Sequence, residues 1–325
     1  MRLTGHKGSY INRNQRIPFV FEGKQYYGFE GDTIASALIA NDELILSRSF
    51  KYHRPRSVLT MSGHDANSLV QVGEEPNARA DKYEITSGLI VGGQNFYGSL
   101  KKDRARILNH FSRFLPVGFY YKTFFRPKGI WNYWDILIRN FAGLGKVDTN
   151  AKKYESDKEY KFCDVAVIGA GPAGLSAAIE AGNSGADTIL IDENKLLGGS
   201  LNYARFDIDR TEVIQLRDEM INQVEQNPNI TVYTNATCTG WFAENYLTVM
   251  CENKMLKIRA KHVIAATGIL EQPIIFRNND LPGVMLCSAI QRLINLYGVS
   301  PGSKVLIATT SSDGYATALD LIEAG

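Results

Sequence analysis

Alternation between apolar and polar positions predicts a β-rich domain at the start of the chain. The sequence PFVFEGKQYY, residues 18–27, gives two short strands that meet at a turn over residues 22–24. The sequence DTIASALIA, residues 32–40, then places apolar side chains at helical spacing, with Asp32 as a suitable N-cap. Two strands followed by a helix are typical of a β-grasp domain, of the ubiquitin-like or ferredoxin-like kind. We expect such a domain over residues 1–95.

From residue 161 the pattern changes to buried apolar runs that alternate with amphipathic segments. Such alternation predicts an α/β fold with a parallel sheet. We expect a Rossmann-like domain over residues 161–300, with a helix over 211–225 that buries Val213, Leu216, Met220 and Val224. Further strands are predicted over residues 165–168, 189–191, 230–233 and 262–268, and a hairpin over residues 237–241 and 246–250.

The last 25 residues begin a new α/β pattern. Residues 304–310 predict a strand and residues 315–324 predict a helix. We interpret residues 301–325 as the incomplete start of a second nucleotide-binding-like subdomain. The turn between them, TTSSDG, keeps one glycine where a phosphate-binding turn needs three, so we expect it to bind no phosphate.

Residues 96–160 follow neither pattern. The first part is rich in aromatic and basic side chains, and residues 147–160 are polar. Aromatic rings between basic side chains can stack on single-stranded nucleic acid. The net charge of the chain is only +2, however, and no recognition motif is present, so we expect no nucleic-acid partner. We interpret the segment as a connecting arm and linker that packs on its neighbours or on another subunit.

The strongest chemical signal is the sequence VAVIGAGPAGL, in which a predicted strand turns into a predicted helix. Gly169 permits the tight turn, Gly171 lets the backbone approach a pyrophosphate, and Gly174 lets the helix pack closely on the strand. The helix start offers free N–H groups to phosphates. The next strand ends about 20 residues on in Asp192 and Glu193, which suit an unphosphorylated ribose and disfavour NADP. The sequence therefore predicts a dinucleotide site.

The four cysteines narrow the possible chemistry. Cys163, Cys238, Cys251 and Cys287 lie far apart and form no C-x-x-C pair, which argues against a zinc site, a redox pair and a disulfide scaffold. The loop over residues 47–57, where a ferredoxin of this shape carries cluster cysteines, contains none. We therefore expect no metal site and no iron–sulfur cluster.

Composition sets the remaining limits. The chain has 325 residues, of which 44% are hydrophobic and 22% charged, as in globular proteins. No apolar run is long enough to span a bilayer, and the N-terminus has no signal-peptide core. We expect a cytoplasmic protein with no membrane partner.

Several stretches carry a family resemblance. They are GDTIASAL (31–38), RSFKYHRPR (48–56), EPN (75–77), LPVGFYYKTF (115–124) and LPGVM (281–285). Together they resemble the alpha-subunit family of heterotetrameric sarcosine oxidases, which also includes subunits of amine and opine oxidases and of hydrogen cyanide synthase. The tripeptide Ala-Thr-Gly at residues 266–268 fits the two-dinucleotide-domain flavoprotein fold of glutathione reductase type, here truncated.

The resemblance implies that substrate oxidation and NAD binding take place on different subunits. In such oxidases sarcosine, O2 and water give glycine, formaldehyde or methylene-tetrahydrofolate, and H2O2. The substrate is oxidised by FAD in the beta subunit, FMN lies between the alpha and beta subunits, and the Gly-rich site of alpha holds NAD that takes no known part in turnover. Gamma and delta subunits complete the complex. A full alpha subunit ends in a tetrahydrofolate-binding domain, which is not found in these 325 residues, so we expect the chain to be a fragment.

The same resemblance assigns roles to residues, none of them catalytic. The pyrophosphate would be held by the turn formed by Gly169, Ala170, Gly171, Pro172, Ala173 and Gly174. Asp192 and Glu193 would meet the adenosine ribose, with Asn194 beside them. The remaining contacts would come from Gly199 and Ser200 near the diphosphate or second ribose, from Cys238 near the adenine, and from Thr267 and Gly268 over the phosphates. Two of these have a structural alternative: Ser200 as a helix cap and Cys238 as a core residue.

Two other functions stay open from the sequence. One is a self-sufficient FAD-dependent pyridine-nucleotide oxidoreductase with FAD in the Gly169 site, although the chain lacks the redox cysteine pair of disulfide reductases. The other is a non-enzymatic β-grasp scaffold. Lys51, His53 and Arg54 form an unusual polar cluster, which faces a flavin phosphate, a partner subunit or solvent.

Overall fold

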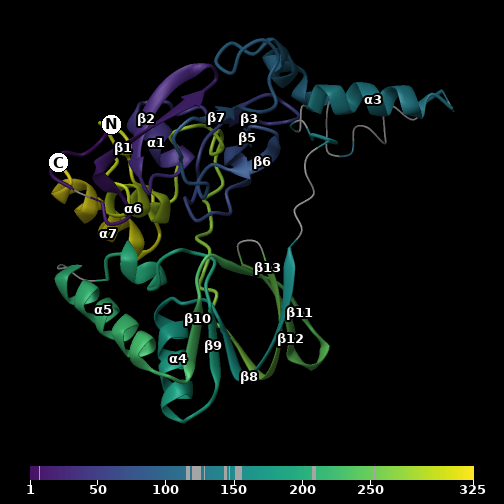
Figure 1. Cartoon of the computed structure of the whole chain (residues 1–325). Helices are drawn as coiled ribbons and strands as arrows, with labels where there is room; N and C mark the ends of the chain where they lie inside the picture. The colour runs from purple at the N-terminus through teal and green to yellow at the C-terminus, as the bar shows by residue number, and fades with distance from the viewer. Residues whose placement is uncertain are drawn as a thin grey trace. The chain divides into compact units, whose positions relative to one another are not determined.

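A computed structural model describes residues 1–6, 8–114, 118, 126–127, 129–142, 145, 147–150, 156–206, 210–251 and 254–325 (Figure 1). The chain forms two compact units, each described by itself. The β-grasp unit comprises residues 1–151 and 271–325, and the Rossmann unit comprises residues 152–270. The predicted Rossmann-like domain extends to residue 300, whereas the structure groups residues 271–300 with the first unit.

A mixed five-stranded sheet is the centre of the β-grasp unit. Its order is β2 (Lys24–Glu30), β1 (Asn12–Phe21), β7 (Leu89–Gly92), β5 (Leu69–Val72) and β6 (Glu75–Arg79). Strands β1 and β7 are parallel, and the other neighbours are antiparallel. Glu22 and Gly23 join β1 to β2 with positive φ angles of 49° and 73°, as a tight hairpin turn requires. The predicted strand–turn–strand is therefore confirmed.

Helix α1 (Ile34–Ala40) follows, and its cap differs from the expectation. Thr33 is the N-cap and forms a capping box with Ser36, so the prediction of Asp32 as N-cap is wrong. The Asp32 carboxylate is used elsewhere, because it accepts hydrogen bonds from the backbone of Phe29 and from the guanidinium of Arg2.

The rest of the β-grasp unit consists of two short strands, helices and irregular segments. Its remaining elements are β3 (Ser47–Arg48), β4 (Pro55–Arg56), η1 (Ala66–Ser68), η2 (Arg104–Phe114), α3 (Trp131–Ala142), α6 (Cys287–Asn295) and α7 (Ser312–Glu323). The chain after α6 runs beside the N-terminus, because Ser9 N–H donates to the Asn295 carbonyl and Leu3 N–H to that of Gly298. These bonds explain why residues 271–300 group with the first unit. Most of the aromatic stretch 115–125 lies outside the described residues.

One predicted strand is missing. Residues 304–310 do not form a β-strand, although α7 follows as predicted. A strand needs a neighbour for its hydrogen-bond ladder, and no described strand pairs with this segment.

The Rossmann unit contains a six-stranded sheet in the order β10 (Ile230–Tyr233), β9 (Thr188–Ile191), β8 (Asp157–Ile168), β13 (Lys254–Ala265), β12 (Tyr246–Cys251) and β11 (Ala236–Phe242). The first four strands are parallel, and β13, β12 and β11 form an antiparallel meander. The predicted hairpin is confirmed as β11 and β12, which are joined by η4 (Ala243–Asn245).

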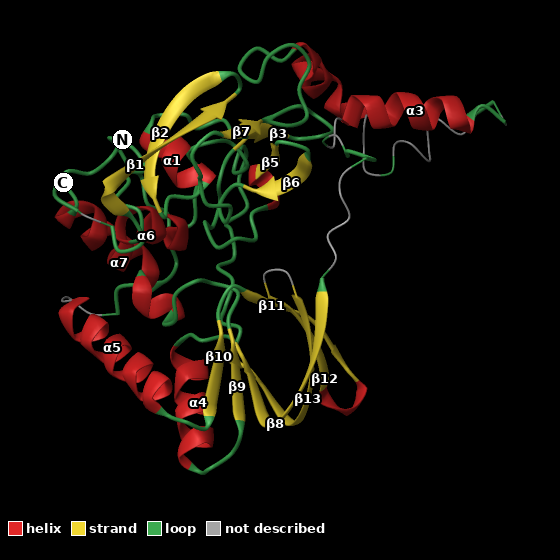
Figure 2. Ribbon diagram, viewed as in Figure 1, coloured by secondary structure: helices red, strands yellow, loops and turns green. Residues whose placement is uncertain are grey.

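Two helices cover the parallel part of this sheet (Figure 2). Helix α4 (Pro172–Asn183) packs on β8, β9 and β10, and α5 (Arg210–Gln226) packs on α4. The core on this face includes Leu175, Leu190 and Val224. The face of α5 differs by one position from the prediction, since Leu216 is exposed and the stem of Arg217 packs inward on Gly198.

Two features are absent from the described residues. None of their helices has the length and apolar character needed to cross a bilayer. In the same part of the chain, no group of three or more His, Cys, Asp or Glu side chains could hold a metal ion.

Candidate dinucleotide site

The three glycines after β8, at positions 169, 171 and 174, differ in the space that a side chain would find there. Gly169 has a φ of +99°, and a Cβ there would lie 2.3 Å from the Ala266 carbonyl oxygen. A Cβ on Gly174 would lie 1.8 Å from the Gly169 carbonyl oxygen, so α4 can pack on the turn only without a side chain. Both positions therefore require glycine for the fold itself.

Gly171 is different, because the space next to it is open. The nearest atom to a Cβ built there is the Gly199 Cα at 4.0 Å. Gly171 is also the N-cap of α4, has extended backbone angles (φ −74°, ψ −175°) and offers no side chain as a cap. Pro172 follows at the first helical position, where its missing N–H costs nothing. Packing of the described residues therefore does not by itself require glycine at 171.

Asp192, at the end of β9, is buried and holds the glycine-rich turn in place. One carboxylate oxygen accepts the backbone N–H of Ala170 at 2.6 Å. The other accepts the backbone N–H and the side-chain amide of Asn194, at 2.7 and 3.0 Å. Both oxygens are therefore already engaged by the protein. Glu193, the next residue, is half-buried.

The segment after β9 returns to the same turn. Gly198 N–H donates to the Ala170 carbonyl at 2.8 Å, and this bond brings Gly199 close to Gly171. Ser200 lies within η3 (Gly199–Asn202), where its carbonyl accepts from Ala204. The N-cap of η3 is Gly198, so Ser200 does not cap this helix.

The remaining predicted site residues lie on two other elements. Cys238 is on β11, partly buried against the core on the far face of the sheet from α4, and burial raises the pKa of its thiol. Thr267 and Gly268 follow β13 and are exposed, with the Thr267 nitrogen next to Gly169. The structure thus brings Gly169, Thr267 and the start of α4 together.

Sequence reasoning missed the supporting role of Arg217. Its stem covers Gly198, which has a φ of +110°, and its guanidinium donates to the side-chain oxygen of Asn202 at 3.3 Å. The only signal in the sequence was the pair of adjacent glycines at 198 and 199.

Two family models match the two parts of the chain. The model of a 2Fe-2S iron-sulfur cluster binding domain matches residues 14–95, and that of pyridine nucleotide-disulphide oxidoreductase matches residues 163–297. The first match covers a stretch without any cysteine.

Comparison of whole sequences identifies the relatives. The alpha subunit of sarcosine oxidase from Rhizobium meliloti (strain 1021) is 39% identical over 338 residues, which cover 98% of this chain and 34% of that protein. This chain is a homologue of sarcosine oxidase alpha subunits. It spans about a third of the length of these oxidoreductase relatives.

More distant similarity agrees with this grouping. An opine oxidase subunit of Agrobacterium tumefaciens (strain Ach5) is 31% identical over 50% of this chain and 35% of its own length. Hydrogen cyanide synthase subunit HcnB of Pseudomonas aeruginosa is 26% identical over 44% of this chain and 32% of its own. The resemblance that the sequence motifs indicated is confirmed.

Solved structures support the fold. The structure of L-proline dehydrogenase from P. horikoshii matches 96% of this chain and 52% of its own, with a TM-score of 0.66 and 24% identity. The predicted order of a ferredoxin-like β-grasp domain and a Rossmann-like domain of flavoprotein type is therefore confirmed.

Proposed function

We propose that this chain is the nucleotide-binding part of an alpha-type subunit of a flavin-dependent amine oxidase, with NAD in the Gly169 site. The observation that carries the proposal is the open space at Gly171, directly at the start of α4. Neighbouring glycines are explained by packing, whereas this one is explained by a ligand. A pyrophosphate placed there would meet N–H groups of the first helical turn and the positive end of the helix dipole.

The acidic end of β9 supports an unphosphorylated ribose. Glu193 would accept the ribose hydroxyls together with Asp192, whose oxygens also accept from the turn and from Asn194. A 2′-phosphate at this place would be repelled by both carboxylates, which favours NAD over NADP. Asn194, Gly199, Ser200, Thr267 and Gly268 would complete the site, and the backbone near Cys238 would meet the adenine.

Catalysis is assigned to a partner subunit. The relatives are named as subunits of oxidases, and the chain has no cysteine pair for dithiol chemistry. By resemblance, FMN would lie between this chain and a beta subunit, and FAD in the beta subunit; these flavins would supply the redox chemistry. Gamma and delta subunits would complete the complex. This chain would bind the nucleotide and build the interface.

The alternative function places FAD in the same site, in a self-sufficient pyridine-nucleotide oxidoreductase. Its support is the match of residues 163–297 to pyridine nucleotide-disulphide oxidoreductases. Absorption and mass spectra of the nucleotide released from purified, denatured protein separate the two functions. Colourless NAD supports the first proposal, and a flavin band with the mass of FAD replaces it by the second. Release of no nucleotide, together with no binding of added NAD or FAD, contradicts both.

A further inference from the structure

A basic pocket opens in the β-grasp unit, whereas Gly169 belongs to the Rossmann unit. Its volume is about 300 Å³, near the lower limit for small-molecule sites. Residues from three distant segments line it: Ile45, Arg48, Tyr52, Arg54, Pro55, Lys101, Arg106, Asn109 and Leu281. Four of these are cationic and none is acidic. Such a lining is unusual, because like charges repel when they are brought together without a counter-ion.

The ion-pair partners of these cations do not neutralise them. Asp103 lies 3.8 Å from Arg48, Glu43 lies 2.8 Å from Lys101, and Asp280 pairs with Arg54. Asp280 also pairs with Arg56, which adds a further positive charge behind the pocket wall. Among the residues that the structure describes, these five cations and three carboxylates carry a net charge of +2. A phosphate monoester carries about −2 at neutral pH, which matches this excess.

Arg48 is the fixed part of the pocket. Its side chain is almost fully buried, and its guanidinium donates to the carbonyls of Leu100 at 2.7 Å, His53 at 2.7 Å and Lys101 at 3.1 Å. These bonds hold the charge in one place, so no side-chain entropy is lost when an anion binds. Burial lowers the pKa of Arg48, Asp103 raises it and Arg106 lowers it again, so Arg106 is close enough to repel.

Lys101 and Arg106 supply the accessible charges. The Lys101 side chain is 68% exposed, and Arg106 is exposed on η2. The Glu43 carboxylate that pairs with Lys101 is nearly buried and also accepts a hydrogen bond from the Tyr26 hydroxyl at 3.0 Å, so it keeps one partner when Lys101 turns to a ligand. Asn109 adds an amide, whereas Ile45, Pro55 and Leu281 give an apolar wall.

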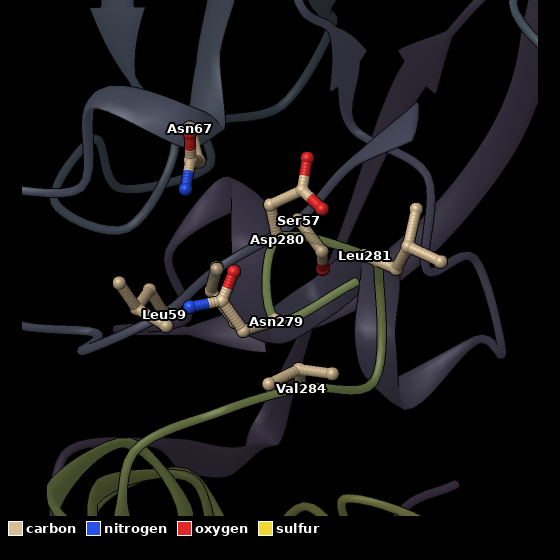
Figure 3. Close-up of a pocket in the computed structure, with 8 residues that line it drawn as sticks. Ser57, Leu59, Asn67, Asn279, Asp280, Leu281 and Val284 are labelled. Atoms are coloured by element: carbon tan, nitrogen blue, oxygen red, sulfur yellow. The ribbon is translucent and has the colours of Figure 1, made fainter. Parts of the chain in front are cut away.

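A second hollow adjoins Leu281 and is no ligand site. Figure 3 shows Asp280 and Leu281 on one loop next to Ser57. This hollow holds about 10 Å³, which is room for one water molecule at most.

We propose that the basic pocket binds a phosphate monoester. The phosphate would meet Arg48, Lys101 and Arg106, and the organic part would lie on the apolar wall. Three probes distinguish the sources of this chemistry: inorganic phosphate, AMP and flavin mononucleotide. The proposal does not depend on which nucleotide occupies the Gly169 site.

Titration calorimetry of each probe at low ionic strength tests the proposal, with variants that have matched controls. Arg106→Gln and Lys101→Ala remove charges from the pocket, whereas Arg104→Gln and Lys102→Ala remove exposed charges next to them in the sequence that do not line it. We expect each pocket variant to weaken binding about tenfold or more, as the loss of a charge-assisted hydrogen bond does, and each control to have little effect.

A second variant separates this pocket from the dinucleotide site. Binding to the basic pocket should persist in Gly171→Val, which blocks the Gly169 site. Preference for flavin mononucleotide over AMP would identify a flavin ligand, and equal affinity for all three probes would identify a general phosphate site. No binding of any probe would overturn the proposal. Binding that Gly171→Val abolishes, or that the control variants weaken as much as the pocket variants do, would overturn it too.

Discussion

The carboxylate of Asp192 lies 2.6 Å from the backbone nitrogen of Ala170 and so ties the end of β9 to the glycine-rich turn after β8. The hydrogen bond is buried and charge-assisted, which makes it stronger than a neutral one. An acid at the end of this strand is usually explained by the ribose that it binds. Here Asp192, the first of two adjacent acids, also positions the turn.

We predict that Asp192→Asn lowers the free energy of unfolding by about 1–3 kcal/mol. The amide keeps one acceptor oxygen, but its NH2 group would face either Ala170 N–H or Asn194 N–H, which are donors themselves. Urea denaturation of the two proteins measures the difference. Unchanged stability would show that the turn does not depend on Asp192.

Glu193→Gln is the matched variant, and we predict that it affects the affinity for NAD more than the stability of the protein. The Glu193 side chain is half-buried, whereas that of Asp192 is buried and bonded to the turn, so the stability should change less than in Asp192→Asn. Affinity for NAD should fall, since an amide oxygen is a weaker acceptor for ribose hydroxyls than a carboxylate. Titration of NAD into both variants checks this division; equal affinity of Glu193→Gln and the parent protein would refute the role of Glu193.

Substitution of Gly171 should separate binding from folding. We predict that Gly171→Val melts close to the parent temperature but binds no nucleotide, because its Cβ meets open space and its branches fill the place of the pyrophosphate. Gly174→Ala is the contrast, since its Cβ would collide with the Gly169 carbonyl and should lower the melting temperature. Thermal melts and NAD titrations of both variants are the measurements. A folded Gly171→Val protein with full nucleotide content would remove the site assignment.

Local patterns in the sequence predicted much of the fold. The glycine-rich turn into α4, the first hairpin and the β11–β12 hairpin are all set by residues close together in the chain. The errors came where distant residues decide. Asp32 resembles an N-cap, but Arg2 uses its carboxylate, and Thr33 takes the cap. Leu216 fits the helical period, yet Arg217 packs inward because Gly198 leaves room for its stem.

The candidate sites, too, could be predicted from the sequence only in part. The glycines and the acids at 192 and 193 were visible as a motif, but the burial of Asp192 depends on Ala170 and Asn194. The basic pocket had a weaker signal, a polar cluster at residues 51–54. Its charges come together only when residues 101–109 and Leu281 fold against that loop, which no spacing in the sequence indicates.

Low pH should weaken the ion pairs that Asp280 makes with Arg54 and Arg56. Burial alone raises the pKa of Asp280, but hydrogen bonds from Arg54 and Arg56 outweigh it and lower the pKa to about 2, from an ordinary value of 3.8. A carboxyl group with a lowered pKa stabilises the fold above its unfolded pKa and loses this effect as the pH falls to the folded one.

We therefore predict that Asp280→Asn is less stable than the parent protein at pH 5 and that the difference shrinks between pH 4 and about 2. Urea midpoints across this range measure it. Asp42→Asn is the control, because Asp42 is exposed and its ion pair with the N-terminus should contribute little at any pH. A difference for Asp280→Asn that stays constant with pH would argue against the ion pair as its source.

Residues 14–95 match a 2Fe-2S cluster domain, yet we predict that the purified protein holds no cluster. All four cysteines lie at or beyond residue 163, so this domain offers no thiolate to iron. Iron by mass spectrometry and acid-labile sulfide should both be far below one cluster per chain. Stoichiometric iron and sulfide that remain with a fragment of residues 1–95 would contradict the prediction.

Finally, we predict that this chain alone produces no hydrogen peroxide from sarcosine. If the function proposed above is correct, the substrate and both flavins lie on, or against, another subunit, and this chain contributes the nucleotide site and the interface. A peroxide-coupled assay of the purified chain should therefore stay at background, also after FAD and FMN are added. Peroxide added to the same sample must be recovered, and circular dichroism must show a folded protein, so that a silent assay is informative. Steady turnover without any added subunit would place the reacting centre in this chain and would favour the self-sufficient oxidoreductase instead.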